Sequence, residues 1–201
     1  MKKILTALVV ATGLLLAGCS NVDAAVTLGD TKITTAELQV NVDLLLAERA
    51  KVDTSQMQLQ TGETLLRNQL NFKVLIAGFA EIAKELDIQI TSSEIAGRRA
   101  EIVEQVGGEE ALPGALVSAS ISPADLDGYL RAIITTEKLG EALLQTGVAE
   151  AEVQNRTQQL FVAKVNELKI KVNPRYGKWD ATTGQIVAAG AAGDAVTPSQ
   201  E

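Results

Sequence analysis

The chain has 201 residues, a formal net charge of −7 at pH 7, one cysteine and no histidine. The absence of histidine excludes a Ser-His-Asp triad, a Cys-His pair and a histidine zinc site, and the sequence has no phosphate-binding glycine motif. The acidic charge argues against binding to nucleic acid or, by charge, to an anionic membrane surface, and we expect no cofactor or metal.

The N-terminal segment has the pattern of a secretory signal. Lys2 and Lys3 precede an uncharged apolar run, Ile4 to Ala17. A membrane-spanning helix needs roughly 20 apolar residues, so this run is too short to be one. A basic start followed by a short apolar core is typical of a signal peptide.

Leu16-Ala17-Gly18-Cys19 matches the lipobox of bacterial lipoproteins. We therefore predict a signal peptide over residues 1–18 with cleavage after Gly18, lipid modification of Cys19, and a lipidated tether over residues 19–24. Two acyl chains on the cysteine anchor a protein stably, whereas one chain binds only weakly. The alternative is an ordinary secretory signal with a chance cysteine.

The predicted location is therefore extracytoplasmic, on a bacterial membrane. Removal of residues 1–18 takes away two lysines and no acidic residue, which leaves 16 basic and 25 acidic residues and a net charge of −9. A mature chain of this size can bury one real core, because a domain of about 150 residues buries roughly 70% of its extended surface.

The first elements of the mature chain are a strand and a capped helix. Residues 25–28 have β-type residues, and a Gly29-Asp30 turn follows them. Thr34 and Glu37 form a capping box, which predicts a helix to about Lys51. The strongest helix is predicted over residues 63–86, where apolar residues occupy two neighbouring faces and indicate packing on two sides.

Three further helices are predicted after this central one. Thr91 and Glu94 form a second capping box, and its helix should end at Gly107-Gly108. A short helix is expected after Pro113-Gly114. Ser122-Pro123 predicts the start of a helix that reaches about Gln145, with an apolar face that includes Ile133 and Ile134. The last helix is predicted over residues 149–165.

The C-terminal part is predicted to return to the N-terminal strand. Residues 168–172 alternate between apolar and polar, which predicts a half-exposed strand that pairs with residues 26–28. Tyr176 and Trp179 should pack this closing segment onto the helices. Residues 181–201 are rich in small residues, and we expect a disordered tail there.

No catalytic site is predicted from the acidic pairs. Paired carboxylates can carry out acid-base chemistry, and the chain has Glu109-Glu110 and Asp125 with Asp127. Each pair lies at a helix end or in a loop, where carboxylates are common for electrostatic reasons.

The order of these features resembles the N-terminal chaperone domain of the SurA, PrsA and trigger-factor group. Residues 83–94 are similar to the pattern Ala-x-x-x-Gly-Ile-x-Val-Thr-x-x-Glu, with Asp87 where glycine is usual. Residues 172–180 resemble the closing segment of that group, with Pro-Arg-Tyr-Gly where Pro-Arg-Phe-Gly is common. The resemblance covers about residues 24–180.

The resemblance implies a mainly α fold: a multi-helix SurA N-terminal-like bundle over residues 25–180, with a small two- or three-stranded β-sheet joining the N- and C-terminal segments.

Members of the group often carry a parvulin isomerase domain before the closing strand. Here the last helix leads almost directly into that strand, and the histidines of a parvulin site are missing. We therefore do not expect prolyl isomerase or other enzyme activity.

The implied function is that of an ATP-independent chaperone, or holdase. Its partners would be unfolded or nascent secreted and envelope proteins, and its lipid would hold it at the membrane. Apolar helical surfaces suit this role, because apolar burial depends on area rather than on geometry. The alternative is a structural or adaptor lipoprotein that docks one specific envelope partner.

Overall fold

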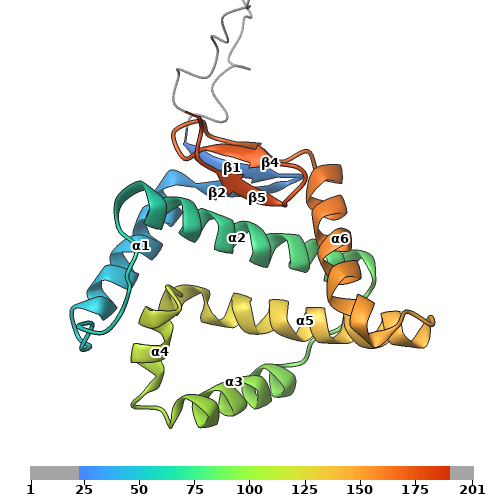
Figure 1. The fold of residues 1–201 in the computed structure, drawn as a ribbon, viewed down its shortest axis with the longest axis horizontal. Helices are drawn as coiled ribbons and strands as arrows, with labels where there is room; N and C mark the ends of the chain where they lie inside the picture. Colours follow the sequence, from blue (N-terminus) through green and yellow to red (C-terminus); the bar gives the residue numbers. More distant parts are fainter. Residues whose placement is uncertain (1–22, 191–201) are drawn as a thin grey trace, which may run out of the picture.

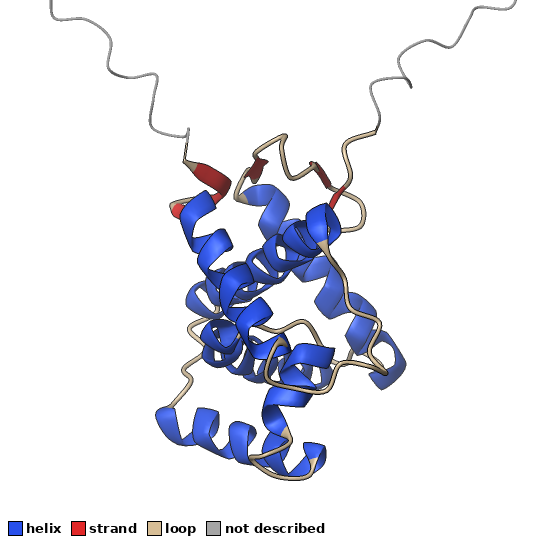
Figure 2. Ribbon diagram, turned by 90° about the vertical axis from the view of Figure 1, so that its left-hand side faces the viewer, coloured by secondary structure: helices blue, strands red, loops and turns tan. Residues whose placement is uncertain are grey.

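Helices form most of residues 23–190, which are the residues that the computed structural model describes (Figure 1). A three-stranded and a two-stranded antiparallel sheet gather at one end of the helices (Figures 1 and 2). The predicted mainly α class with a small sheet is therefore confirmed.

In chain order the elements are β1 (Ala24–Leu28), β2 (Thr31–Thr34), α1 (Thr35–Arg49), α2 (Gly62–Glu85), α3 (Ser92–Val106), α4 (Leu112–Ser118), a short 3-10 turn (Pro123–Asp125), α5 (Leu126–Gln145), α6 (Glu150–Glu167), β3 (Lys171–Val172), β4 (Lys178–Asp180) and β5 (Gln185–Val187).

Both predicted capping boxes are present. The amide of Glu37 donates to the Thr34 hydroxyl at 3.0 Å, and the Thr34 amide donates back to the Glu37 carboxylate at 2.7 Å. Thr91 and Glu94 make the same pair of bonds at the start of α3. Helix α3 ends, as predicted, at Gly107, whose φ of 97° lies in the left-handed region that glycine adopts without strain.

Helix α2 is the central element of the fold. It packs against α1, α5, α6 and β1, and it lies beneath the sheet in Figure 1. This confirms the prediction of packing on two sides. Its buried apolar side chains are those of Leu65, Leu70, Val74, Phe79 and Ile82.

The three-stranded sheet joins the two ends of the described chain. Its strand order is β2-β1-β3, with Val26 opposite Val172 and Thr27 opposite Lys171, which confirms the predicted pairing. The strand is shorter than the predicted 168–172, because α6 continues to Glu167 and Lys169 takes a left-handed φ of 53°. The first and last parts of residues 23–190 thus hold one another in a self-contained unit.

The closing segment packs onto the helices as predicted. Tyr176 is buried in the main apolar core. The Trp179 indole N–H donates to the Asn166 side chain of α6 at 2.7 Å, and its ring packs against the core.

The prediction of a disordered tail over residues 181–201 is wrong for its first part. Residues 185–187 form β5, which pairs with β4. Ile186 is only 2% exposed, and the Asn71 side chain of α2 bonds both its amide (2.6 Å) and its carbonyl (3.0 Å). Burial of Ile186 and its bonds to Asn71 order the hairpin, although residues 181–201 as a whole are rich in small residues. Residues 191–201 lie outside the described residues.

Two predicted helix starts are also corrected. Helix α4 begins at Leu112, before Pro113, because a proline in the first turn lacks only an N–H that the helix does not use. Ser122 makes no side-chain cap, and α5 begins at Leu126 after a 3-10 turn. The turn directs Asp125 into the interior, where Lys73 of α2 pairs with it at 3.0 Å.

Helices α2 and α6 cross closely at Gly78. A Cβ atom at this position would lie 2.5 Å from Cε2 of Phe161 and 3.0 Å from Cγ2 of Val165. The Phe161 ring also stacks on Phe79, with ring centroids 5.1 Å apart. The crossing therefore requires glycine at position 78.

We predict that Gly78→Ala lowers the free energy of unfolding by about 1–3 kcal/mol, the usual cost of overpacking a core. Gly97→Ala on α3 is the matched control, because nothing lies within 4 Å of a Cβ there. The control should raise stability by up to about 1 kcal/mol, since alanine favours a helix more than glycine does. Urea unfolding followed by circular dichroism measures both. Equal stabilisation by the two variants would contradict the close crossing.

Helix α3 is attached to α5 through charged side chains. No residue of α3 is fully buried, although Ile102 and Val103 pack against a small apolar cluster. Glu94 pairs with Lys138 of α5 at 2.5 Å, and Arg98 pairs with Glu137 of α5. The hydrogen bond from Lys138, followed by those from the amide and hydroxyl of Thr91, lowers the pKa of Glu94 from 4.5 to about 2.

The low pKa of Glu94 predicts a pH-dependent attachment of α3. A carboxylate with a lowered folded-state pKa stabilises the fold above its unfolded pKa, and this contribution is lost as pH falls from about 4.5 to 2. The protection factors of the α3 amides, which compare their exchange with that of an unfolded chain at the same pH, should therefore fall over this range. Glu94→Gln should accelerate exchange at pH 7 and flatten the pH dependence, whereas Glu104→Gln should leave both unchanged. An unchanged pH profile in Glu94→Gln would contradict this role.

Candidate functional site

The acidic pairs singled out in the sequence do not form a common site. Asp125 is buried and bonded by Lys73 and by the Asn41 side chain, so it joins α1, α2 and the start of α5. Arg99 binds Glu109 through two nitrogens, and this hydrogen bonding lowers the pKa of the Glu109 carboxyl. Asp125 and Glu109 therefore each have a partner that ties together separate parts of the fold.

The two predicted modification residues, Gly18 and Cys19, lie outside the described residues and remain predictions. Within residues 23–190, no cluster of three or more side chains is suited to hold a metal ion. None of the described helices combines the length and the apolar character needed to cross a membrane.

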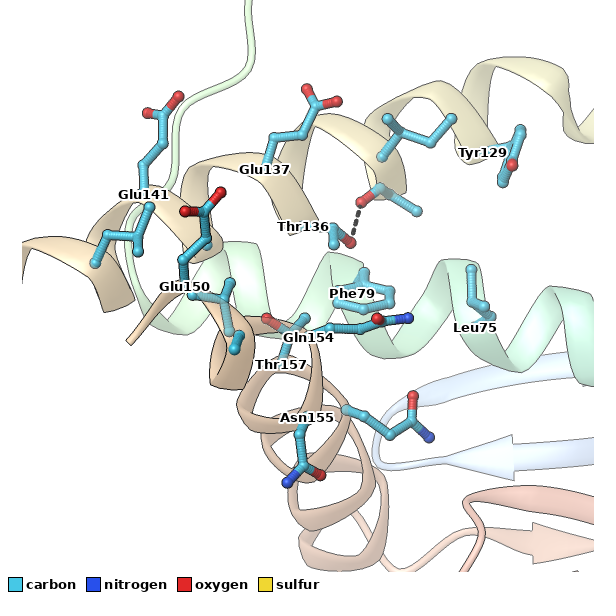
Figure 3. A pocket seen from close by; sticks show the side chains of 17 residues that line it. Leu75, Phe79, Tyr129, Thr136, Glu137, Glu141, Glu150, Gln154, Asn155 and Thr157 are labelled. Atoms are coloured by element: carbon cyan, nitrogen blue, oxygen red, sulfur yellow. Dashed lines mark hydrogen bonds between the residues drawn. The ribbon is translucent and has the colours of Figure 1, made fainter. Parts of the chain in front are cut away.

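A large open groove lies between α5 and α6, with α2 as its floor; we call it the α5–α6 groove (Figure 3). Its volume is about 1050 Å³, which is at the upper end of the 300–1,000 Å³ usual for ligand sites. The lining residues are Leu75 and Phe79 of α2; Tyr129, Ala132, Ile133, Thr136, Glu137, Gly140, Glu141 and Leu144 of α5; and Glu150, Ala151, Val153, Gln154, Asn155, Thr157 and Gln158 of α6.

The floor and the α5 wall of the groove are mainly apolar. Leu75 and Phe79 rise from α2 toward the groove, and Tyr129 lies on α5 beside them (Figure 3). Leu144 is 46% exposed at the far end of α5. The Thr136 hydroxyl donates to the carbonyl of Ala132 in its own helix at 2.8 Å, so this polar group is already satisfied. Apolar side chains of a bound segment could be buried here, at roughly 25 cal/mol per Å² of apolar surface.

The mouth of the groove carries three carboxylates. Glu137 and Glu141 of α5 and Glu150 of α6 point toward the same side in Figure 3. Glu137 is paired with Arg98 of α3, whereas Glu141 and Glu150 have no ion-pair partner among the described residues. Of the described residues that line the groove, none is lysine or arginine.

The α6 wall supplies side-chain amides. Gln154, Asn155 and Gln158 are exposed on this wall and line the groove. Gln158 donates to the carbonyl of Thr183, and the Asn155 oxygen accepts from Gln159, both at 3.4 Å. An amide side chain has further donor and acceptor capacity, which can pair with the backbone of a bound peptide whatever the peptide sequence. The groove thus combines an apolar floor, an amide wall and an acidic mouth.

Close helix contacts position the walls of the groove. Gly78 sets the approach of α6 to α2, as described above. Gly140 of α5 faces Val153 of α6, and a Cβ there would lie 3.3 Å from the valine Cγ1. The two helices are joined by a short link that contains Gly147 at a φ of 90°.

The sequence contained one signal of the groove. The sequence places both Ile133 and Ile134 on the apolar face of one helix. Consecutive residues are about 100° apart around a helix axis, so these two side chains must point in different directions. Ile134 is buried, whereas Ile133 lines the groove. An apolar residue next to the core stripe thus marked the second apolar surface, but the sequence did not show that α6 would leave it uncovered.

Comparison with known proteins identified no relative. A scan against protein-family models, a search of curated proteins and a search of solved structures each found no match.

Proposed function

We propose that this protein is a membrane-anchored extracytoplasmic holdase, which binds unfolded segments of secreted or envelope proteins without ATP. The observation that carries the proposal is the α5–α6 groove, which is lined largely by apolar side chains, among them Leu75, Tyr129 and the exposed Leu144. An apolar groove with a few polar groups along its rim is the usual form of a binding site. Amides along one wall suit segments of varied sequence.

The order of elements supports the chaperone-domain resemblance. A strand and a capped helix lead into a central helix, and a closing strand returns to the first strand. Asp87, which stands where the family pattern has glycine, takes a left-handed φ of 51°. A backbone position of this kind favours glycine, so the local geometry agrees with the pattern. We therefore propose a SurA N-terminal-like bundle without an isomerase domain.

The alternative is an adaptor lipoprotein that docks one specific partner. The acidic mouth of the groove favours it, because a charged and polar-rimmed surface recognises particular partners more than general clients. The two functions differ in one measurable respect: an adaptor would not protect an unrelated protein.

We predict that the chain from residue 20 to 201, which keeps every described residue, suppresses aggregation of heat-unfolded citrate synthase without ATP. Light scattering should fall at near-stoichiometric ratios, while a prolyl isomerisation assay should show no rate above background. Absence of suppression would overturn the holdase proposal in favour of the adaptor.

Matched variants test whether this activity lies in the groove. Leu144→Gln should weaken suppression by about 2- to 5-fold, since it removes one apolar contact of roughly 1 kcal/mol. Leu86→Gln is the control, because Leu86 is similarly exposed (52%) but lies outside the groove. Circular dichroism should show that both variants are folded. Equal effects of the two substitutions would argue against the groove.

The proposed anchor is tested separately. Cys19→Ser in the full chain should prevent lipid attachment and move the protein from the membrane fraction to the soluble or precursor fraction. Metabolic labelling with a clickable palmitate analogue should mark the parent protein and not the variant. Labelling of the Cys19→Ser protein would refute the predicted lipidation site.

A further inference from the structure

The α5–α6 groove has an electrostatic character that its apolar floor does not require. Three carboxylates, those of Glu137, Glu141 and Glu150, stand at its mouth. Arg98 neutralises only the first of them, and no described lysine or arginine lines the groove. An uncharged apolar segment would gain nothing from this arrangement.

We propose that the groove selects segments in which apolar side chains lie next to lysine or arginine. This inference rests on the proposed function and specifies its clients: basic apolar segments bind, neutral ones bind less well, and acidic ones are rejected. Charge complementarity between the segment and the groove mouth carries the inference.

The geometry fits a lysine or arginine side chain along its whole length. Such a side chain buries its aliphatic stem against apolar surface and keeps its charged end in solvent. In the groove the stem would lie against the exposed side chain of Leu144, and the charge would reach Glu141 or Glu150 at the same end (Figure 3).

The same charges disfavour other occupants. The C-terminal segment, residues 191–201, contains Asp194 and Glu201 and no basic residue. Like charges at the mouth would oppose its entry into the groove. The groove is therefore proposed to receive a separate basic segment rather than the C-terminal segment of this chain.

The test uses three labelled peptides that share one leucine- and alanine-rich core and carry lysine, serine or glutamate at both flanks. Fluorescence anisotropy with residues 20–201 measures their affinities at low salt and at 1 M salt. The lysine peptide should bind about 5- to 20-fold more tightly than the serine peptide at low salt. This ratio should approach one at 1 M salt, where exposed charges are screened.

A double variant, Glu141→Gln with Glu150→Gln, should remove most of the preference and leave binding of the serine peptide unchanged. The control is Glu104→Gln with Glu110→Gln, which changes the net charge equally but lies outside the groove. An equal loss in both variants would mean that only the overall charge of the protein matters, and it would overturn the inference.

The two proposals can fail separately. Equal binding of the lysine and serine peptides would overturn the charge selection and leave the holdase function intact. Failure of all three peptides to bind would overturn the groove as a client site, and the charge selection with it.

Discussion

The close crossing of α2 and α6 at Gly78 is the constraint on which the rest of the structure depends. It lets Phe161 of α6 stack on Phe79 of α2, deep in the main core. The ring of Phe79 also belongs to the floor of the α5–α6 groove. Core packing and groove shape are therefore set by the same contact, and the groove is formed before anything binds. A preformed site loses less conformational entropy on binding than one that must be ordered.

The core helices and the outer helix α3 are held in place by different interactions. Apolar packing fixes the α2–α5–α6 core, whereas the outer helix α3 is attached partly through Glu94 and Arg98. Arg98 connects this outer helix to the groove, because it pairs with Glu137 at the mouth. The charge available at the mouth thus depends on the position of α3. Neutralisation of Glu137 by a neighbouring helix leaves Glu141 and Glu150 as the groups that face solvent and a possible partner.

Local signals in the sequence predicted much of the fold. The Thr34 and Thr91 caps, the central helix and the pairing of Val26 with Val172 follow from periodicity and hydrogen-bonding chemistry. The β4–β5 hairpin could not be predicted, because its order comes from one buried side chain, Ile186, and from bonds to a distant Asn71. The groove was missed for a related reason. An amphipathic pattern shows that a face is apolar, but only the tertiary arrangement decides whether another element covers it.

The position of β1 in the middle of its sheet has a consequence for the order of folding. Its partner β2 follows it directly, but β3 begins only at Lys171, after all six helices. Asn173 then adds two hydrogen bonds, to the carbonyls of Ala25 (2.9 Å) and Ala24 (3.1 Å). During synthesis from the N-terminus, one edge of β1 therefore stays unpaired until almost the entire helical region has been made. Pairing across so long a loop is slow, and an open strand edge is prone to wrong pairing. The domain must itself remain free of aggregation during this interval, until β3 covers the open edge of β1.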